Sequence, residues 1–346
     1  MTKQRLPILV DERAASAPGL TIHARWLAGA LADPWPTERH ATCGTCAMAK
    51  EPDAQDEIPP GAFNPDTKCC TFTPTLPNFL VGAALVDSTL SPFGRRSLLD
   101  RIAARRGVSP FGVAGVPAVD PQRFGRDPAL RCPHYDHGAC GIWAHRDAVC
   151  TTYYCKHERG ARSYRLWRAI REALACIEQI VARAALLRIG GLPDALFAAD
   201  AERARLPYEA LWGSWAKGEP ALYAATAETV AAMSWEEVQR LGGAALAWEV
   251  EAVRRAEAAL GAPLPERLVP GKMMVTAGEA GGFSVAAYSP LDPVPLDSDV
   301  LAALRRFDGR PRGEVLAEIA REDRIRLEEE VVETLCDLEI LVPAPT

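Results

Sequence analysis

The residues of this chain that could do chemistry are concentrated in its N-terminal half, where eight of the ten cysteines fall within the first 155 residues. They are Cys43, Cys46, Cys69, Cys70, Cys132, Cys140, Cys150 and Cys155. Thiolates are soft ligands that suit zinc and iron–sulfur clusters better than magnesium or calcium. In a reducing compartment, clustered cysteines hold metals more often than disulfides. The pattern therefore predicts a metal-binding module with these eight residues as ligands.

The spacing of the cysteines separates them into groups with different geometry. Cys43 and Cys46 are two residues apart, so both sulfurs can point at one ion. The side chains of adjacent residues such as Cys69 and Cys70 ordinarily diverge, so the two thiolates are expected to bind different metal atoms. A second tetrad consists of Cys132, Cys140, Cys150 and Cys155. Four thiolates for each site would divide the eight into two sites, and the sequence leaves open which four belong together.

The string from Cys132 to Cys155 resembles the second half of the YkgJ-type CxxCxxCC cysteine-cluster family, which is described as zinc- or iron-chelating. The family's pattern also has an isoleucine, aromatic residues and an arginine between the cysteines, and the corresponding residues here are Ile142, Trp143, Arg146 and Tyr154. The first half departs from the pattern, because 22 residues separate Cys46 from the Cys69–Cys70 pair. Asp147 also stands where a proline commonly follows the arginine. The resemblance covers about residues 40 to 160 and implies an iron–sulfur or zinc site.

That family includes proteins similar to flagellin lysine-N-methylases, so the resemblance suggests modification of a peptide or protein. The first functional hypothesis is one or two iron–sulfur clusters of the 4Fe–4S type, used in electron transfer or in such a modification. The alternative is a non-enzymatic zinc-stabilised module for protein interaction. No acid, base or nucleophile stands out, so enzymatic activity is left open. Cys176 and Cys336 are predicted to be buried small hydrophobes rather than ligands.

Several polar residues near the second tetrad could assist a metal. His134, His137, His145 and His157 could each replace a thiolate or form hydrogen bonds near the cluster. Lys156, Arg159 and Arg162 form a basic patch that could attract an anion, although a solvated helix start explains it equally well. The segment from Thr73 to Gly82, directly after Cys69 and Cys70, contains two prolines and is predicted to be a rigid apolar loop.

Composition narrows the class of protein. The formal net charge is 39 minus 45, or −6, so no overall positive field exists to attract nucleic acid or an anionic membrane. The short apolar run from Leu6 to Val10 is too short for a signal peptide, and no apolar stretch approaches the roughly 18 residues of a membrane span. These features predict a cytoplasmic protein with neither nucleic-acid nor membrane partners.

The predicted elements divide the chain into three parts: a loop-rich cysteine module at 1–160, a helical domain at 161–262 and a small domain at 270–346. In the second part, apolar residues from Trp167 to Leu187 recur every three or four positions until Gly190 and Gly191. A second long helix is predicted from a Ser234 cap to Leu260, weakened at Gly242 and Gly243. Shorter helices are predicted over 211–230, and a boundary over 263–270.

The third part is predicted to hold a hairpin and three short helices. Strands at 273–276 and 283–288 are joined by a glycine-rich turn, and helices follow at 301–307, 315–319 and 327–338 before an apolar tail at 340–342. Residues 272–342 loosely resemble PqqD-like peptide-recognition domains, which implies a peptide or protein partner. The predicted fold is therefore mainly α, with the metal module and a small winged-helix-like α+β domain.

Overall fold

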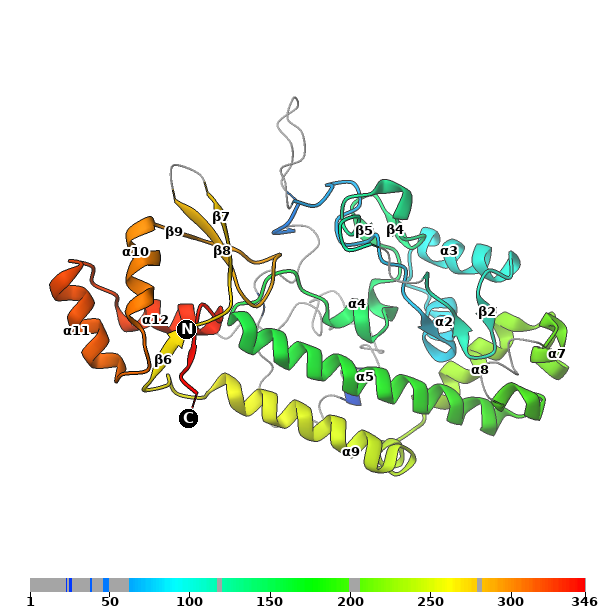
Figure 1. Cartoon of the computed structure of the whole chain (residues 1–346). Helices are drawn as coiled ribbons and strands as arrows, with labels where there is room; N and C mark the ends of the chain where they lie inside the picture. The colour runs from blue at the N-terminus through cyan, green and yellow to red at the C-terminus, as the bar shows by residue number, and fades with distance from the viewer. Residues whose placement is uncertain are drawn as a thin grey trace. The chain divides into compact units, whose positions relative to one another are not determined.

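The computed structural model describes residues 23, 25, 26, 38, 46–49, 62–116, 120–198, 206–278 and 282–345. Its contacts form two compact units that are each discontinuous in sequence. Among described residues, the first unit contains those up to 26 and those within 46–153 and 169–254; the second contains residue 38, 154–168 and 255–345. Helices predominate and the sheets are small and antiparallel, which confirms a mainly α protein with a smaller α+β part (Figure 1). The predicted three-part division stays a prediction.

Both long helices predicted from apolar spacing are present. α5 (Gly160–Ile189) ends at Gly190 and Gly191, whose φ angles of 72° and 73° are left-handed. α9 (Trp235–Leu260) begins after Ser234, whose hydroxyl accepts a 3.2 Å hydrogen bond from the Glu237 N–H. Gly243 interrupts α9 with φ 52° and ψ −137°, at the predicted weak point. No helix in the described ranges is long and apolar enough to cross a membrane.

Shorter helices complete the first unit. They are α2 (Asn78–Val86), α3 (Pro92–Ala103), α4 (Ala148–Thr152), α7 (Tyr208–Trp212) and α8 (Glu219–Ala231), with 3₁₀ turns η1 (Pro128–Leu130), η2 (Trp143–His145), η3 (Asp194–Phe197) and η4 (Gly213–Trp215). α2 packs closely against α8, because a Cβ at Gly82 would lie only 1.8 Å from the Tyr223 carbonyl oxygen. Only glycine permits this approach of the two backbones.

The first unit also contains two small sheets. β1 (Leu76–Pro77), β3 (Gly112–Val113) and β2 (Val108–Ser109) lie in that order, and β4 (Tyr135–Asp136) pairs with β5 (Ala139–Cys140). The predicted rigid loop after Cys70 is therefore only partly a loop, since it contains β1 and the start of α2. At the start of α2, the buried Asn78 side chain donates hydrogen bonds to the carbonyls of Pro110 and Ala182 at 3.1 and 3.2 Å. The core contains Leu76, Val81, Leu98, Trp212 and Tyr223.

The second unit contains the predicted hairpin and more strands than expected. β7 (Met274–Ala277) pairs with β8 (Phe283–Ala286), which pairs with β9 (Val294–Leu296). β10 (Leu341–Pro343) pairs with β6 (Leu268–Pro270), so the predicted apolar tail and the predicted boundary form a two-stranded sheet. The helical elements are α10 (Ser298–Ala303), η6 (Leu304–Arg306), α11 (Arg312–Glu322) and α12 (Glu329–Asp337). Leu268, Val285, Phe307, Val315 and Ile319 lie in its core.

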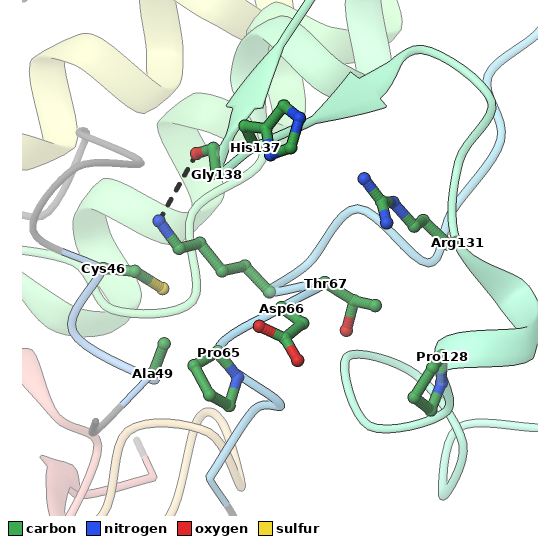
Figure 2. Close-up of a pocket in the computed structure, with 10 residues that line it drawn as sticks. Cys46, Ala49, Pro65, Asp66, Thr67, Pro128, Arg131, His137 and Gly138 are labelled. Atoms are coloured by element: carbon green, nitrogen blue, oxygen red, sulfur yellow. Dashed lines mark hydrogen bonds between the residues drawn. The ribbon is translucent and has the colours of Figure 1, made fainter. Parts of the chain in front are cut away.

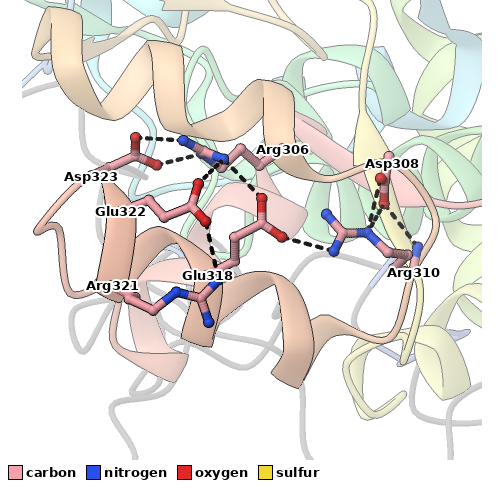
Figure 3. A network of polar contacts seen from close by, with 7 residues as sticks. All are labelled: Arg306, Asp308, Arg310, Glu318, Arg321, Glu322 and Asp323. Atoms are coloured by element: carbon pink, nitrogen blue, oxygen red, sulfur yellow. Dashed lines mark hydrogen bonds and ion pairs between the residues drawn. The ribbon is translucent and has the colours of Figure 1, made fainter.

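An ion-pair network connects η6 with α11 in the second unit (Figure 3). Arg306 pairs with Glu318, Glu322 and Asp323 at 2.8, 2.9 and 2.6 Å. Arg310 extends the network by pairing with Glu318 at 2.7 Å and Asp308 at 2.9 Å. The shared carboxylate of Glu318 therefore joins two arginines on the surface of this unit.

Candidate metal centre

Hydrogen bonds hold the Cys69–Cys70 segment against the segment that ends at Cys132. The Asn64 N–H donates to the Gly125 carbonyl at 2.8 Å, and the Gly125 N–H donates to the Thr71 hydroxyl at 2.7 Å. The Cys132 N–H then donates to the Cys70 carbonyl at 2.7 Å. The adjacent cysteine pair is thus fixed beside the first member of the second tetrad.

The β4–β5 hairpin positions Cys140. Its turn contains His137 and Gly138 with φ of 41° and 85°, the left-handed pair that a tight two-residue hairpin requires. The Gly141 N–H donates to the His134 carbonyl at 2.7 Å, which extends the pairing beyond the strands. The hairpin folds the chain back on itself and places Cys140 close enough to Cys132 to contribute to the raised pKa of the Cys132 thiol.

Cys150 lies in α4, whose N-cap is the buried residue Asp147. The Asp147 carboxylate accepts a 3.0 Å hydrogen bond from the Cys150 N–H and a further bond from its thiol. Cys140 lies close enough to Cys150 to raise its pKa, and Cys69 lies close enough to Cys140 to raise the pKa of Cys140. Hydrogen bonds and electrostatic interactions thus link five predicted ligands in the first unit. We call them the cysteine cluster: Cys69, Cys70, Cys132, Cys140 and Cys150.

A buried arginine, Arg146, interacts with several cysteines of this cluster. Arg146 donates to the carbonyls of Trp143 and Cys150 at 3.1 and 3.0 Å, and its guanidinium lies 3.5 Å from the centre of the Trp143 ring. Its positive charge favours the ionised forms of Cys69, Cys140 and Cys150. The family resemblance predicted an arginine near the ligands, and in the structure the charge of Arg146 acts on three of these cysteines.

The cysteines differ in how readily they ionise. The pKa of Cys69 is lowered, first by a hydrogen bond with Cys70 and then by the charges of Arg146 and Lys68, despite its burial. Burial raises the pKa of the Cys132 thiol to about 12 and also raises the pKa values of Cys140 and Cys150. Metal ligation would displace protons from the last three thiols, so binding would depend on pH.

Two further residues near Cys132 were not expected from spacing. Arg101, only 7% exposed, is close enough for its charge to act on Cys132. It lies beside Leu98 and Ile102 on the buried side of α3, and an arginine on an apolar helix face is the signal that could have found it. Ser97 lies 2.8 Å from His134 Nδ1, which fixes that imidazole in place.

His134 has an open position for a ligand. It is 1% exposed, its Nε2 has no hydrogen-bond partner among the described residues, and burial lowers its pKa to about 4. A neutral imidazole with an unused nitrogen fits a metal, as does the soft sulfur donor set beside it. In the described parts of the chain, no group of three or more histidine, cysteine, aspartate or glutamate side chains is arranged so that it could hold a metal ion.

The remaining predicted ligands have different locations. Cys43 lies outside the described residues, and Cys46 lines a cavity in the first unit (Figure 2). Cys155 belongs to the second unit. Cys176 and Cys336, which were predicted to be buried small hydrophobes, are partly buried.

The other histidines and the basic patch have local partners. His145 lies 2.8 Å from Asp87, and the His137 side chain is 94% exposed. His157 packs against the rings of Tyr154, Tyr164 and Tyr288. The basic patch is ion-paired within the second unit: Lys156 with Asp292, Arg159 with Glu333 and Asp337, and Arg162 with Asp337. Local ion pairs therefore account for that patch.

Comparisons of the chain with protein-family models, with curated proteins and with solved structures found no match.

Proposed function

We propose that this protein carries a cysteine-ligated metal centre of the iron–sulfur type, used in electron transfer or in modification of a peptide or protein. The observation that supports the proposal is the chain of hydrogen bonds and electrostatic interactions that links Cys69, Cys70, Cys132, Cys140 and Cys150 in the first unit. A 4Fe–4S cluster and a structural zinc each take four thiolates, so these five cysteines supply enough ligands for one such centre. The 4Fe–4S cluster would supply one-electron chemistry.

Two buried cations support an anionic centre of this kind. Arg146 and Arg101 are 8% and 7% exposed, and their charges act on different members of the cysteine cluster. Thiolate-ligated clusters carry net negative charge, and nearby positive charge and hydrogen bonds set their reduction potentials. The chain's own contribution would be to hold the sulfurs, exclude water and stabilise the negative charge.

A second candidate function is a zinc-stabilised protein-interaction module that uses residues 272–342. β7 lies at the edge of its sheet, and Met274 and Val275 are 58% and 43% exposed. An exposed edge strand with apolar side chains can pair with an extended segment of a peptide. This feature also suits a modifying protein, since such an edge could hold its substrate. Winged-helix character and the PqqD-like resemblance remain part of this proposal.

The deciding experiment is metal and sulfide analysis, with a visible spectrum, of protein purified without oxygen and without a metal-binding tag. Iron with sulfide and absorbance near roughly 400 nm is the expected result. Cys140→Ala should remove the absorbance, whereas Cys176→Ala, outside the cluster, should retain it. Colourless protein with stoichiometric zinc would overturn the iron–sulfur proposal and favour the second candidate.

A further inference from the structure

Glu178 of α5 joins three segments of the first unit through one oxygen atom. Its Oε1 accepts a 2.8 Å hydrogen bond from the Ala148 N–H, which holds α4 beside α5 (Figure 1). The same oxygen lies 2.7 Å from His23 Nε2 in the N-terminal part of the chain. His23 is 0% and Glu178 7% exposed, so this contact is closed to solvent. Cysteine spacing predicted no role for either residue.

The contact matters for α4 because that helix is only five residues long. The first N–H groups of a helix have no partner within it, so the groups that accept from them fix where the helix begins and how it is oriented. Here two carboxylates accept: Asp147 from the Cys150 N–H at 3.0 Å, and Glu178 from the Ala148 N–H. Glu178 therefore helps to fix the short helix on which Cys150 lies.

His23 stabilises the Glu178 carboxylate in this position. A buried carboxylate is costly unless it is paired and hydrogen-bonded. Burial raises the pKa of Glu178, the hydrogen bond and the charge of His23 oppose that rise, and the charge of Asp147 adds to it. A carboxylate oxygen can only accept, so His23 Nε2 is the donor in the 2.7 Å contact. Without His23, Glu178 would lose this donor and would be held less firmly against α4.

His23 is itself fixed by the residues that follow it. Trp26 is 0% exposed, and its ring meets the ring of Phe79 in α2 edge to face, with 6.0 Å between the ring centroids. The Arg25 guanidinium donates to the Ala231 carbonyl at 2.8 Å, at the end of α8. Contacts with α2 and α8 therefore anchor this part of the chain independently of α4.

We propose that His23 and Glu178 are positioning residues for the metal centre: by holding α4, they keep Cys150 at its place in the cysteine cluster and slow the release of the metal. They act through the Ala148 N–H, whereas Arg146 acts on the thiols by its charge. The effect on metal release rests on the proposed function. The effect on α4 stands without it, because it concerns hydrogen bonds within the chain.

Hydrogen–deuterium exchange of the purified full-length protein tests the effect on α4, whatever metal the protein carries. Mass spectrometry gives the exchange rates of the Ala148 and Cys150 N–H groups relative to that of the Gly141 N–H, which is hydrogen-bonded just after β5. His23→Ala should raise these relative rates about tenfold, since Glu178 loses a buried partner and α4 opens more often. His23→Gln, whose amide can still donate to Glu178, should keep them near the wild-type values. Glu178→Gln, which keeps an acceptor oxygen without the charge, should give a smaller increase than His23→Ala.

Release of the bound metal to a chelator tests the second effect. It should be about tenfold faster from His23→Ala than from the wild type, and unchanged in Glu172→Gln, a control at an exposed position of the same helix as Glu178. Purified protein without metal would overturn the proposed function and the effect on metal release together, whereas the exchange rates still decide the role at α4. Unchanged relative exchange rates in both His23→Ala and Glu178→Gln would overturn the positioning role. Faster exchange with unchanged metal release would overturn its link to the metal.

Discussion

The Cys132 N–H donates a 2.7 Å hydrogen bond to the carbonyl oxygen of Cys70. This bond joins two groups of cysteines that are far apart in the sequence and have α2 and α3 between them. The adjacent pair therefore lies beside Cys132, although the two segments are distant in the sequence. Segments of irregular backbone meet here through specific hydrogen bonds rather than through one extended element.

Replacement of Arg146 should affect both stability and metal retention. Arg146→Gln removes the charge that favours ionised thiols and the hydrogen bonds to Trp143 and Cys150. We expect a loss of about 2 kcal/mol in unfolding free energy and faster release of metal to a chelator. Denaturant unfolding and the rate of chelator-induced metal loss measure these two effects.

Arg146→Lys is the matched control, since it keeps the charge and loses the planar fork. It should be destabilised but should release metal more slowly than Arg146→Gln. Equal metal release from both variants would show that the positive charge of Arg146 has no part in retaining the metal.

The long helices were predictable because their information is local. The recurrence of apolar residues and the Ser234 cap lie within each helix, so α5 and α9 follow from the sequence. The β6–β10 pair was missed because its partners, Leu268–Pro270 and Leu341–Pro343, are brought together only by the tertiary fold. Three-residue strands are also too short to show alternation.

The same limit applied to the cysteine cluster. Residue type predicted metal chemistry, but the turns and short elements between the cysteines have no periodicity from which their meeting could be derived. The contribution of Arg101 depends on the packing of α3 near Cys132, which cysteine spacing does not encode. The positions of Cys69, Cys132 and Cys150 relative to one another therefore required the structure.

The network around Arg306 should stabilise the second unit in a salt-dependent way. Its three carboxylate partners and the shared Glu318 make it more than an isolated surface pair. Arg306→Gln should lower the melting temperature in about 20 mM salt, and the difference from the wild type should shrink in about 500 mM salt because the charges are screened. Circular dichroism during heating measures both differences.

Arg326→Gln provides the control for that network, because its side chain is 84% exposed and pairs with the exposed Glu328, outside the network. Its melting temperature should stay close to that of the wild type in both salt concentrations. If Arg306→Gln behaved in the same way, the network would not contribute to stability.

Backbone packing between α2 and α8 should make Gly82 intolerant of any side chain. In Gly82→Ala the new methyl group would lie 1.8 Å from the Tyr223 carbonyl oxygen, so the helices must separate. The free energy of unfolding should fall by about 3 kcal/mol. Gly313→Ala in α11 is the contrasting variant, since no described atom beyond its chain neighbours and its own helix backbone lies within 4 Å of the position that its methyl group would take. Helix propensity should then improve stability by about 0.5 kcal/mol. Denaturant unfolding of both variants should give opposite signs.

Glu38 should make stability fall as pH rises. Burial raises its pKa from the ordinary value of 4.5 to about 7, although the Glu158 N–H and the Trp167 indole donate to it at 2.7 and 3.0 Å. The folded state therefore holds this proton more tightly than the unfolded state. The contribution of Glu38 to stability is fully present below about pH 4.5 and is lost, by about 3 kcal/mol in all, as the pH rises from about 4.5 through 7.

Glu38→Gln removes the titrating group and tests this sign. The variant loses one hydrogen-bond acceptor, which lowers its stability by a nearly constant amount at every pH. The informative quantity is the slope of unfolding free energy against pH, obtained from denaturant titrations between about pH 5 and pH 7.5. Subtracting the variant's slope from that of the wild type should leave a negative contribution from Glu38. Parallel curves would show that the Glu38 carboxyl has the same pKa in both states.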